Sequence, residues 1–144
     1  ISVSASWSPR QLSRLCGLGG HPWDLLVLNE KEARAACSDV ATTPQRLAAA
    51  SSSVLVTLGA NGVFGVLNGV DLRVDAAPAQ VRDPTGAGDA FCGGLIAGLV
   101  RGATPMEAVR LGTRASARIL SQTGGLVLDP RIMSGLMEEI EWKS

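Results

Sequence analysis

The chain has 144 residues, of which 46% are hydrophobic and 18% are charged. Its 13 basic and 13 acidic residues cancel, so no charge excess indicates a nucleic acid or an anionic membrane as partner. The longest apolar run, residues 90–100, is too short to span a bilayer. These properties are typical of a globular protein, and we expect a single domain over residues 1–144.

The first half of the chain alternates strand and helix signals. Apolar runs predict strands at residues 1–5 and 24–28, and the second has no polar alternation, as in a strand buried on both faces. Helices are expected where a polar residue, in two cases followed by proline, opens a run of helix formers. These helices are predicted over residues 9–18, 29–37 and 43–51.

The second half begins with a buried strand over residues 54–58. Two further strands, 63–67 and 70–74, flank Asn68-Gly69, a dipeptide typical of a tight hairpin. Helices are then predicted over residues 89–100, 104–123 and 129–141, the second of them opened by Thr104 and Glu107 at the spacing of a capping box. The alternation predicts an α/β fold with a mostly parallel sheet, in which ligands bind at the carboxyl ends of the strands.

One stretch, residues 83–91, carries the strongest chemical signal. Its sequence Asp-Pro-Thr-Gly-Ala-Gly-Asp-Ala-Phe places a glycine-rich turn directly before a helix. The first N–H groups of a helix have no internal acceptor, and Gly86 and Gly88 lack the side chains that would keep an anion away from them. Asp89 follows as a candidate general base. A glycine turn before a helix also occurs for structural reasons alone, and Phe91 replaces the third glycine of a dinucleotide fingerprint.

The whole string 83–91 resembles the C-terminal signature of the ribokinase-like carbohydrate kinases, also called the phosphofructokinase B family. The resemblance implies a three-layer α/β fold with helices on both faces of a mostly parallel sheet that includes a hairpin. It also implies ATP-dependent phosphoryl transfer to a sugar hydroxyl. Asp89 would then be the catalytic base, and the backbone of Gly86, Ala87 and Gly88 would form an anion hole.

Two further segments resemble nucleotide-binding parts of the same family. The turn after residues 54–58 would contact ATP, and small residues of the helix over 104–123 would line the adenine pocket. The residues implied are Thr57, Gly59, Ala60 and Gly62 in the turn, and Thr113 and Ser116 in the helix. The alternatives are an ordinary tight connection for the first segment and close helix packing for the second.

A metal site is implied by Asn29-Glu30-Lys31-Glu32, which resembles the family's Asn-x-x-Glu motif. Asn29 and Glu32 would hold Mg²⁺ through water, since this ion usually keeps several of its waters. The alternative is that acidic residues here only favour a helix N-terminus. Asp83 resembles part of a monovalent-cation site, for K⁺, found in some members.

The remaining expectations concern partners and location. Family members are longer and carry a sugar-binding half that this chain does not show. Because the chain begins at Ile1 with an apolar β-type stretch, it looks like an internal part of a larger protein. We therefore expect a small-molecule sugar substrate, a missing N-terminal half or another subunit, and a homo-oligomer, with weak or no activity of this chain alone. The scattered Cys16, Cys37 and Cys92 indicate reduced thiols and a cytoplasmic protein.

Two alternatives to a sugar kinase remain open. One is a non-catalytic half-domain that binds nucleotide or only oligomerises through an exposed sheet edge. The other is a vitamin kinase for pyridoxal or hydroxymethylpyrimidine, which shares the Gly-Asp site.

Overall fold

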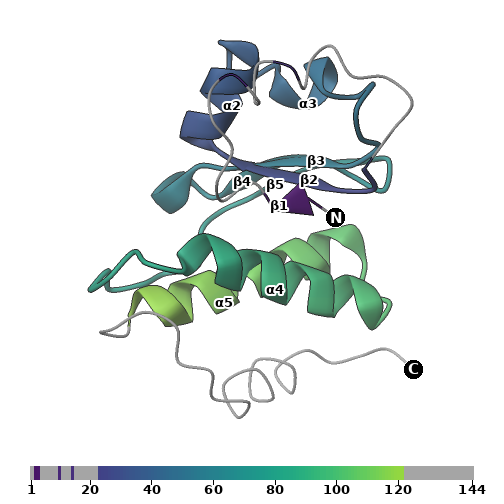
Figure 1. The fold of residues 1–144 in the computed structure, drawn as a ribbon. Helices are drawn as coiled ribbons and strands as arrows, with labels where there is room; N and C mark the ends of the chain where they lie inside the picture. The colour runs from purple at the N-terminus through teal and green to yellow at the C-terminus, as the bar shows by residue number, and fades with distance from the viewer. Residues whose placement is uncertain (1, 4–9, 11–13, 15–22, 122–144) are drawn as a thin grey trace. The chain divides into compact units, whose positions relative to one another are not determined.

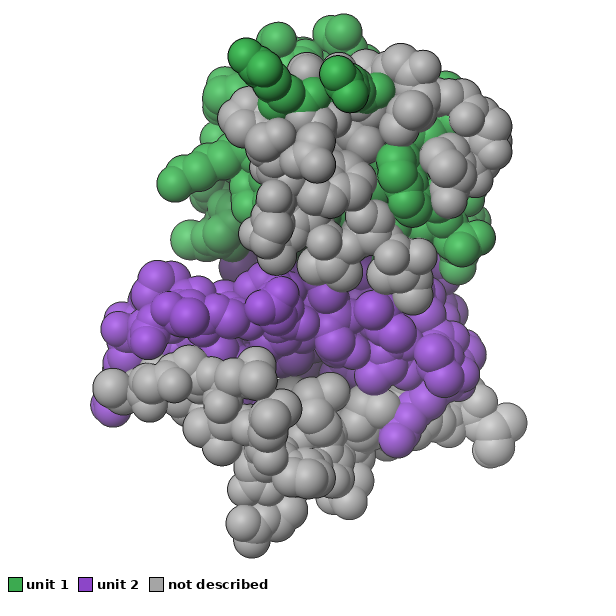
Figure 2. Space-filling model, in the orientation of Figure 1, with its two compact units in different colours: residues 1–74 green, residues 75–144 purple. Residues whose placement is uncertain are grey.

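The computed structural model describes residues 2–3, 10, 14 and 23–121 of the chain. The chain divides into two compact units, residues 1–74 and 75–144, coloured separately in Figure 2. The helix predicted over residues 129–141 lies outside the described residues, as does the helix over 9–18 apart from Arg10 and Arg14. The expectation of one domain over residues 1–144 stays a prediction.

The first unit is built on a five-stranded sheet in the order β1-β2-β3-β4-β5. Strands β1 to β3 run parallel to one another, whereas β4 is antiparallel to both of its neighbours. The predicted sheet of parallel strands extended by a hairpin is confirmed. The strands are β1 (Ser2–Val3), β2 (Leu26–Asn29), β3 (Val54–Thr57), β4 (Val63–Leu67) and β5 (Val70–Val74).

The hairpin of β4 and β5 has the predicted bounds and turn. Asn68 and Gly69 have φ angles of 50° and 77°, as a two-residue turn with both central residues left-handed requires. Leu67 pairs with Val70 across this turn, which fixes the register of the whole hairpin.

Gly65 in the middle of β4 lies unusually close to the neighbouring strand. Its φ is 143°, and a Cβ built there would lie 2.0 Å from the carbonyl oxygen of Val54 in β3. No residue with a side chain fits at this distance, so glycine is the residue that lets β3 and β4 pair here.

Helices α2 (Glu30–Cys37) and α3 (Thr43–Arg46) lie over one face of the sheet (Figure 1). The core beneath them consists of aliphatic side chains from alternate positions of β2 and β3, closed by residues of the helices and the loop after them. Its members include Leu26, Leu28, Val54, Val56, Ala33, Leu47 and Ala50, all nearly inaccessible to solvent.

The prediction of a helix over residues 43–51 is wrong in its length, because α3 ends at Arg46. The following residues form turns that bring Ser51 beside Trp23 in an isolated parallel bridge. The hydroxyl of Ser51 donates to the carbonyl of Ser53 and accepts from its N–H, which leads the chain into β3. Tertiary pairing thus overrides the helix propensity of Leu47 to Ala50.

The described part of the second unit is a pair of helices, α4 (Ala87–Val100) and α5 (Pro105–Leu120). Glycines let the two backbones approach closely: a Cβ on Gly94 would lie 2.9 Å from the carbonyl oxygen of Leu111, and one on Gly98 would lie 3.0 Å from the Cα of Ala108. The predicted capping box is confirmed, since Thr104 and Glu107 each accept a hydrogen bond from the other's N–H. Within the described residues, no helix has the length and apolar character needed to cross a bilayer.

Candidate functional site

Two of the predicted site residues lie side by side at the carboxyl edge of the parallel strands. Asn29 is the last residue of β2 and Thr57 the last of β3, and the parallel register pairs them directly. The hydroxyl of Thr57 donates to the carbonyl of Leu28 at 3.4 Å, a long hydrogen bond that leaves its lone pairs available. Asn29 and Thr57 therefore share the edge of the sheet at which ligands bind in α/β folds.

The turn that follows β3 at the same strand end contains two glycines in backbone conformations that favour glycine. Gly59 and Gly62 have φ angles of 57° and 84°, and the N–H of Leu58 closes the turn by donating to the carbonyl of Gly62 at 2.7 Å. A Cβ at Gly59 would meet no atom within 4 Å, so its backbone conformation, rather than lack of space, favours glycine. Among the described residues the N–H groups of Gly59 and Ala60 have no acceptor, and both residues are exposed.

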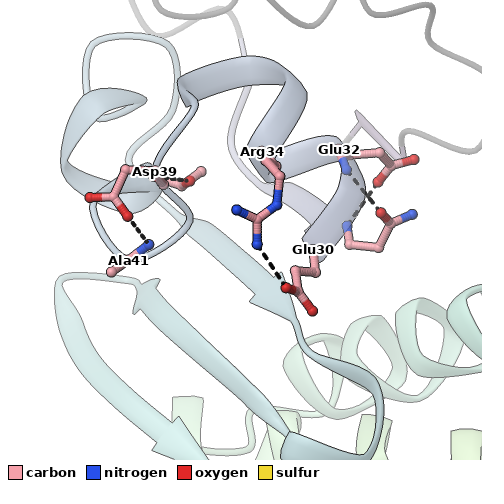
Figure 3. Close-up of polar contacts among 7 residues, drawn as sticks. Glu30, Glu32, Arg34, Asp39 and Ala41 are labelled. Atoms are coloured by element: carbon pink, nitrogen blue, oxygen red, sulfur yellow. Dashed lines mark hydrogen bonds and ion pairs between the residues drawn. The ribbon is translucent and has the colours of Figure 1, made fainter.

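Asn29 and Glu32 cap the start of α2 for each other. The Asn29 Oδ1 accepts from the Glu32 N–H at 3.0 Å, and the Glu32 Oε2 accepts from the Asn29 N–H at 2.8 Å, as the crossed dashed lines of Figure 3 show. The nearby Glu30 instead makes an exposed ion pair with Arg34 at 3.0 Å. The helix-start alternative from the sequence thus describes what these side chains do, and the metal role stays a prediction.

In the second unit, the glycine-rich turn forms the N-terminus of α4, which begins at Ala87 and not at the predicted Asp89. Asp83 stabilises the turn that leads into α4, because its Oδ1 accepts from the Thr85 N–H at 2.9 Å. Gly86 is the N-cap in the left-handed conformation, with φ 80° and ψ 0°. Asp89 therefore occupies the third helical position, where the helix dipole stabilises a carboxylate.

This N-terminus leaves several N–H groups without an acceptor. The Ala87 N–H donates to the carbonyl of Pro84 at 3.3 Å, whereas those of Gly86, Gly88 and Asp89 donate to no other described residue. A Cβ on Gly88 would meet nothing within 4 Å, so the space in front of these donors is open. The sequence had pointed to Gly86, Ala87 and Gly88, and it missed the Asp89 N–H because the position of the N-cap was not fixed by the sequence.

The predicted adenine-pocket residues of α5 have mixed environments. Thr113 is buried, and its hydroxyl donates to the carbonyl of Arg110 within the helix at 2.9 Å. Ser116 is partly buried and makes no hydrogen bond within the described residues through its side chain. The neighbouring Gly112 packs against Phe91 of α4, so close helix packing explains the small residue at position 112.

The described residues include no group of three or more His, Cys, Asp or Glu side chains arranged to hold a metal ion. A shallow hollow of about 260 Å³ lies in the first unit between α3 and the hairpin. It is lined by Pro44, Gln45, Phe64, Gly65, Asp71, Leu72 and Arg73, none of which the sequence had assigned to a site.

Comparison with known proteins agrees with this architecture. Residues 3–130, most of the chain, match the pfkB family of carbohydrate kinases. The chain belongs to this family of carbohydrate kinases.

Individual relatives and solved structures are kinases. The chain is 36% identical over 88 residues to an inositol 3-kinase of Oryza sativa subsp. japonica, covering 61% of this chain and 22% of that protein. It is 33% identical over 109 residues to the ribokinase of Haemophilus influenzae, covering 70% and 36% of the two chains. The structure of adenosine kinase from Sinorhizobium meliloti superposes with a TM-score of 0.76 at 28% identity, covering 90% and 41%.

The ribokinase of Thermotoga maritima has the same fold, with a TM-score of 0.73 at 23% identity over 94% of this chain and 46% of that one. The predicted ribokinase-like fold is therefore confirmed. The chain spans less than half the length of each of these four proteins.

Proposed function

We propose that this chain carries the ATP-binding and catalytic part of a kinase that phosphorylates a hydroxyl group of a sugar or a related polyhydroxylated molecule. The observation that carries the proposal is the N-terminus of α4, where a left-handed Gly86 exposes N–H groups without acceptors beside the exposed carboxylate of Asp89. Anion-binding donors and a base in a single turn are what phosphoryl transfer from a nucleotide requires.

In this mechanism Asp89 accepts the proton of the attacking hydroxyl, a role typically worth ~10²–10⁴ in rate. Its carboxylate makes no hydrogen bond within the described residues, so its oxygens are available. The N–H groups of Gly86, Gly88 and Asp89 donate to the phosphoryl oxygens as negative charge develops there, with Ala87 held in the same turn. Because these donors are backbone groups in a helix, they need no rearrangement during the reaction.

The nucleotide would be held by residues from both resembling segments. Gly59 and Ala60 offer N–H groups that have no acceptor among the described residues, Gly62 offers the open backbone of the same turn, and Thr57 offers a hydroxyl at the same strand end. Thr113 and Ser116 are proposed for the adenine pocket, with the hydroxyl proton of Thr113 already engaged in its own helix.

Mg²⁺ fits Asn29 and Glu32 only through water, because the capping box uses the Asn29 Oδ1 and the Glu32 Oε2. A carboxylate has further lone pairs that can accept from a metal-bound water while capping continues. When bound, the ion neutralises phosphate charge. Asp83 is proposed for K⁺ with its Oδ1 already accepting from Thr85.

The acceptor class is supported by the names of the relatives, which include an inositol 3-kinase, a ribokinase and an adenosine kinase. We propose that acceptor-binding groups come from residues beyond this chain or from another subunit, since the relatives extend well beyond the matched part. We also propose a homo-oligomer in the cytoplasm, where the buried thiols of Cys37 and Cys92 would stay reduced.

The first test is calorimetric titration of MgATP into the chain without any acceptor. Saturable binding at one site is expected. The second test is turnover of ATP with a panel of polyhydroxylated acceptors, by this chain together with the residues or subunit that supply the acceptor-binding groups. Asp89→Asn should lower kcat there by about 10²-fold or more and leave MgATP affinity nearly unchanged. Asp75→Asn is the matched control, since Asp75 is also exposed and is not among the residues proposed for the site. No binding by the folded chain, or equal turnover in the Asp89→Asn variant, would contradict the proposal.

A further inference from the structure

Among the described residues, strand β5 is an edge strand of the first unit's sheet, because it pairs there only with β4. Its outward-facing backbone groups can be identified from the hairpin. Leu67 and Val70 flank the two-residue turn and form a hydrogen-bonded pair, and such pairs alternate with non-hydrogen-bonded ones along an antiparallel ladder. Asp71 and Arg73 therefore occupy non-hydrogen-bonded positions, and their N–H and C=O groups point away from β4.

These outward groups have no other partner in the described part of the chain. Neither the Asp71 N–H nor the Arg73 N–H donates to another described residue, and neither side chain makes an ion pair there. Both side chains are exposed and border the hollow beside α3, so neither is covered by that helix. The edge is thus a short template for an added strand.

The sequence of β5, Val-Asp-Leu-Arg-Val, is complementary to itself in one antiparallel register. With Leu72 opposite Leu72 of a second copy, Asp71 lies opposite Arg73 and Arg73 opposite Asp71. The same register makes both of these pairs hydrogen-bonded, because the outward N–H and C=O groups belong to these two residues. Charge and backbone geometry therefore select the same alignment.

Other alignments oppose like charges. A parallel in-register pair sets Asp71 beside Asp71, and an antiparallel pair centred on residue 71 or 73 sets that residue against itself. Like charges directly opposite each other destabilise a sheet, whereas unlike charges stabilise it. An alternating charged edge deters apolar strands in general, yet it accepts its own copy.

We propose that two copies of this chain associate through β5, in the antiparallel register centred on Leu72, to form one continuous sheet. The proposal is independent of phosphoryl transfer, since it uses no residue assigned to the ATP or catalytic site.

The test is the mass of the chain in solution, by sedimentation velocity over a range of concentrations. The unaltered chain should reach twice its mass of 14.9 kDa as concentration rises. Asp71→Arg places arginine against arginine, and Arg73→Asp places aspartate against aspartate, so each variant should lose the dimer. Mixing the two variants should restore it, because each chain then meets the opposite charge. Asp75→Arg, an exposed position just beyond β5, should leave the dimer intact.

The doubly substituted chain Asp71→Arg/Arg73→Asp provides the second arm, since it restores unlike pairs and should dimerise like the unaltered chain. Circular dichroism of each variant establishes that it is folded before its mass is compared. An unaltered chain that stays monomeric at all concentrations would overturn the proposal. So would single variants that remain dimeric, or a mixture of the two that remains monomeric.

Discussion

Gly112 of α5 lies directly against Phe91 of α4. A Cβ at position 112 would lie 2.8 Å from the Cδ2 and Cε2 atoms of the Phe91 ring and 2.8 Å from the Phe91 carbonyl oxygen. The ring could turn aside, but the carbonyl belongs to a helix and cannot. This contact fixes how closely the two helices pack. It lies at Phe91, two residues after Asp89 in the chain.

Gly112→Ala should destabilise the chain by ~1–3 kcal/mol, because the added methyl group forces the helices apart. Chemical denaturation would measure the change in the free energy of unfolding. Phe91→Leu in the same background should recover only part of the loss, since the carbonyl contact remains. Full stability of the Gly112→Ala chain would show that the helices can separate at little cost.

Gly88 and Gly93 offer a matched pair for testing the anion site. Both are exposed residues of α4, and a Cβ on either would meet nothing within 4 Å. Each substitution to Ala should therefore keep stability or raise it by up to ~1 kcal/mol through the helix propensity of alanine. Only Gly88→Ala should weaken MgATP binding in calorimetry, because only its methyl group occupies the space in front of the free N–H groups. Equal affinity in both variants would place the phosphate elsewhere.

Glu32→Gln separates the helix-start role of Glu32 from its proposed metal role. A glutamine at this position still accepts from the Asn29 N–H, as in other capping boxes, so thermal stability should change by less than ~0.5 kcal/mol. The loss of charge should raise the Mg²⁺ concentration needed for ATP binding. Glu30→Gln is the control: it removes the ion pair with Arg34 in the same turn and should leave the Mg²⁺ requirement unchanged. An unchanged requirement in Glu32→Gln would contradict the metal role.

Arg110, Arg114 and Arg118 form an exposed row at four-residue spacing on α5, with no ion pair to any described residue. Like charges at this spacing destabilise a helix by about 0.2–0.5 kcal/mol per pair, and opposite charges stabilise it by as much. Arg114→Glu should raise the free energy of unfolding by about 1 kcal/mol at low salt, since it converts two repulsive pairs into attractive ones. Arg114→Gln should give about half of this gain, and a gain that persists at high salt would not be electrostatic.

The features that the sequence predicted best are those formed between residues close to one another in the chain. Asn68-Gly69 and the Thr104–Glu107 capping box both appear at the predicted residues, because each is a contact within a few positions of the chain. The predicted length of α3 was wrong, because Ser51 pairs with Trp23, which is far away in the sequence. The onset of α4 was misplaced by two residues, because it depends on the left-handed conformation of Gly86.

The candidate site was predictable as a set of motifs but less so as a set of contacts. The structure pairs Asn29 with Thr57, because the two strands that end at these residues are parallel. The sequence offered, beside the metal site, only the alternative that acidic residues favour a helix N-terminus, and the reciprocal cap between Asn29 and Glu32 came from the structure. The Asp89 N–H as a donor, and the close approach at Gly112, needed the backbone coordinates.

Substitutions at Gly65 would complicate a search for functional residues in a large set of variants of this chain. Any side chain at this position must push β3 and β4 apart, so selection for activity would reject substitutions there as strongly as at Asp89. The two kinds of intolerance have different origins. Variants of Gly65 would disappear from the pool of folded protein, whereas Asp89→Asn would remain abundant and inactive. Scoring protein abundance beside activity is therefore what distinguishes a strand-spacing residue from a chemical one in this sequence.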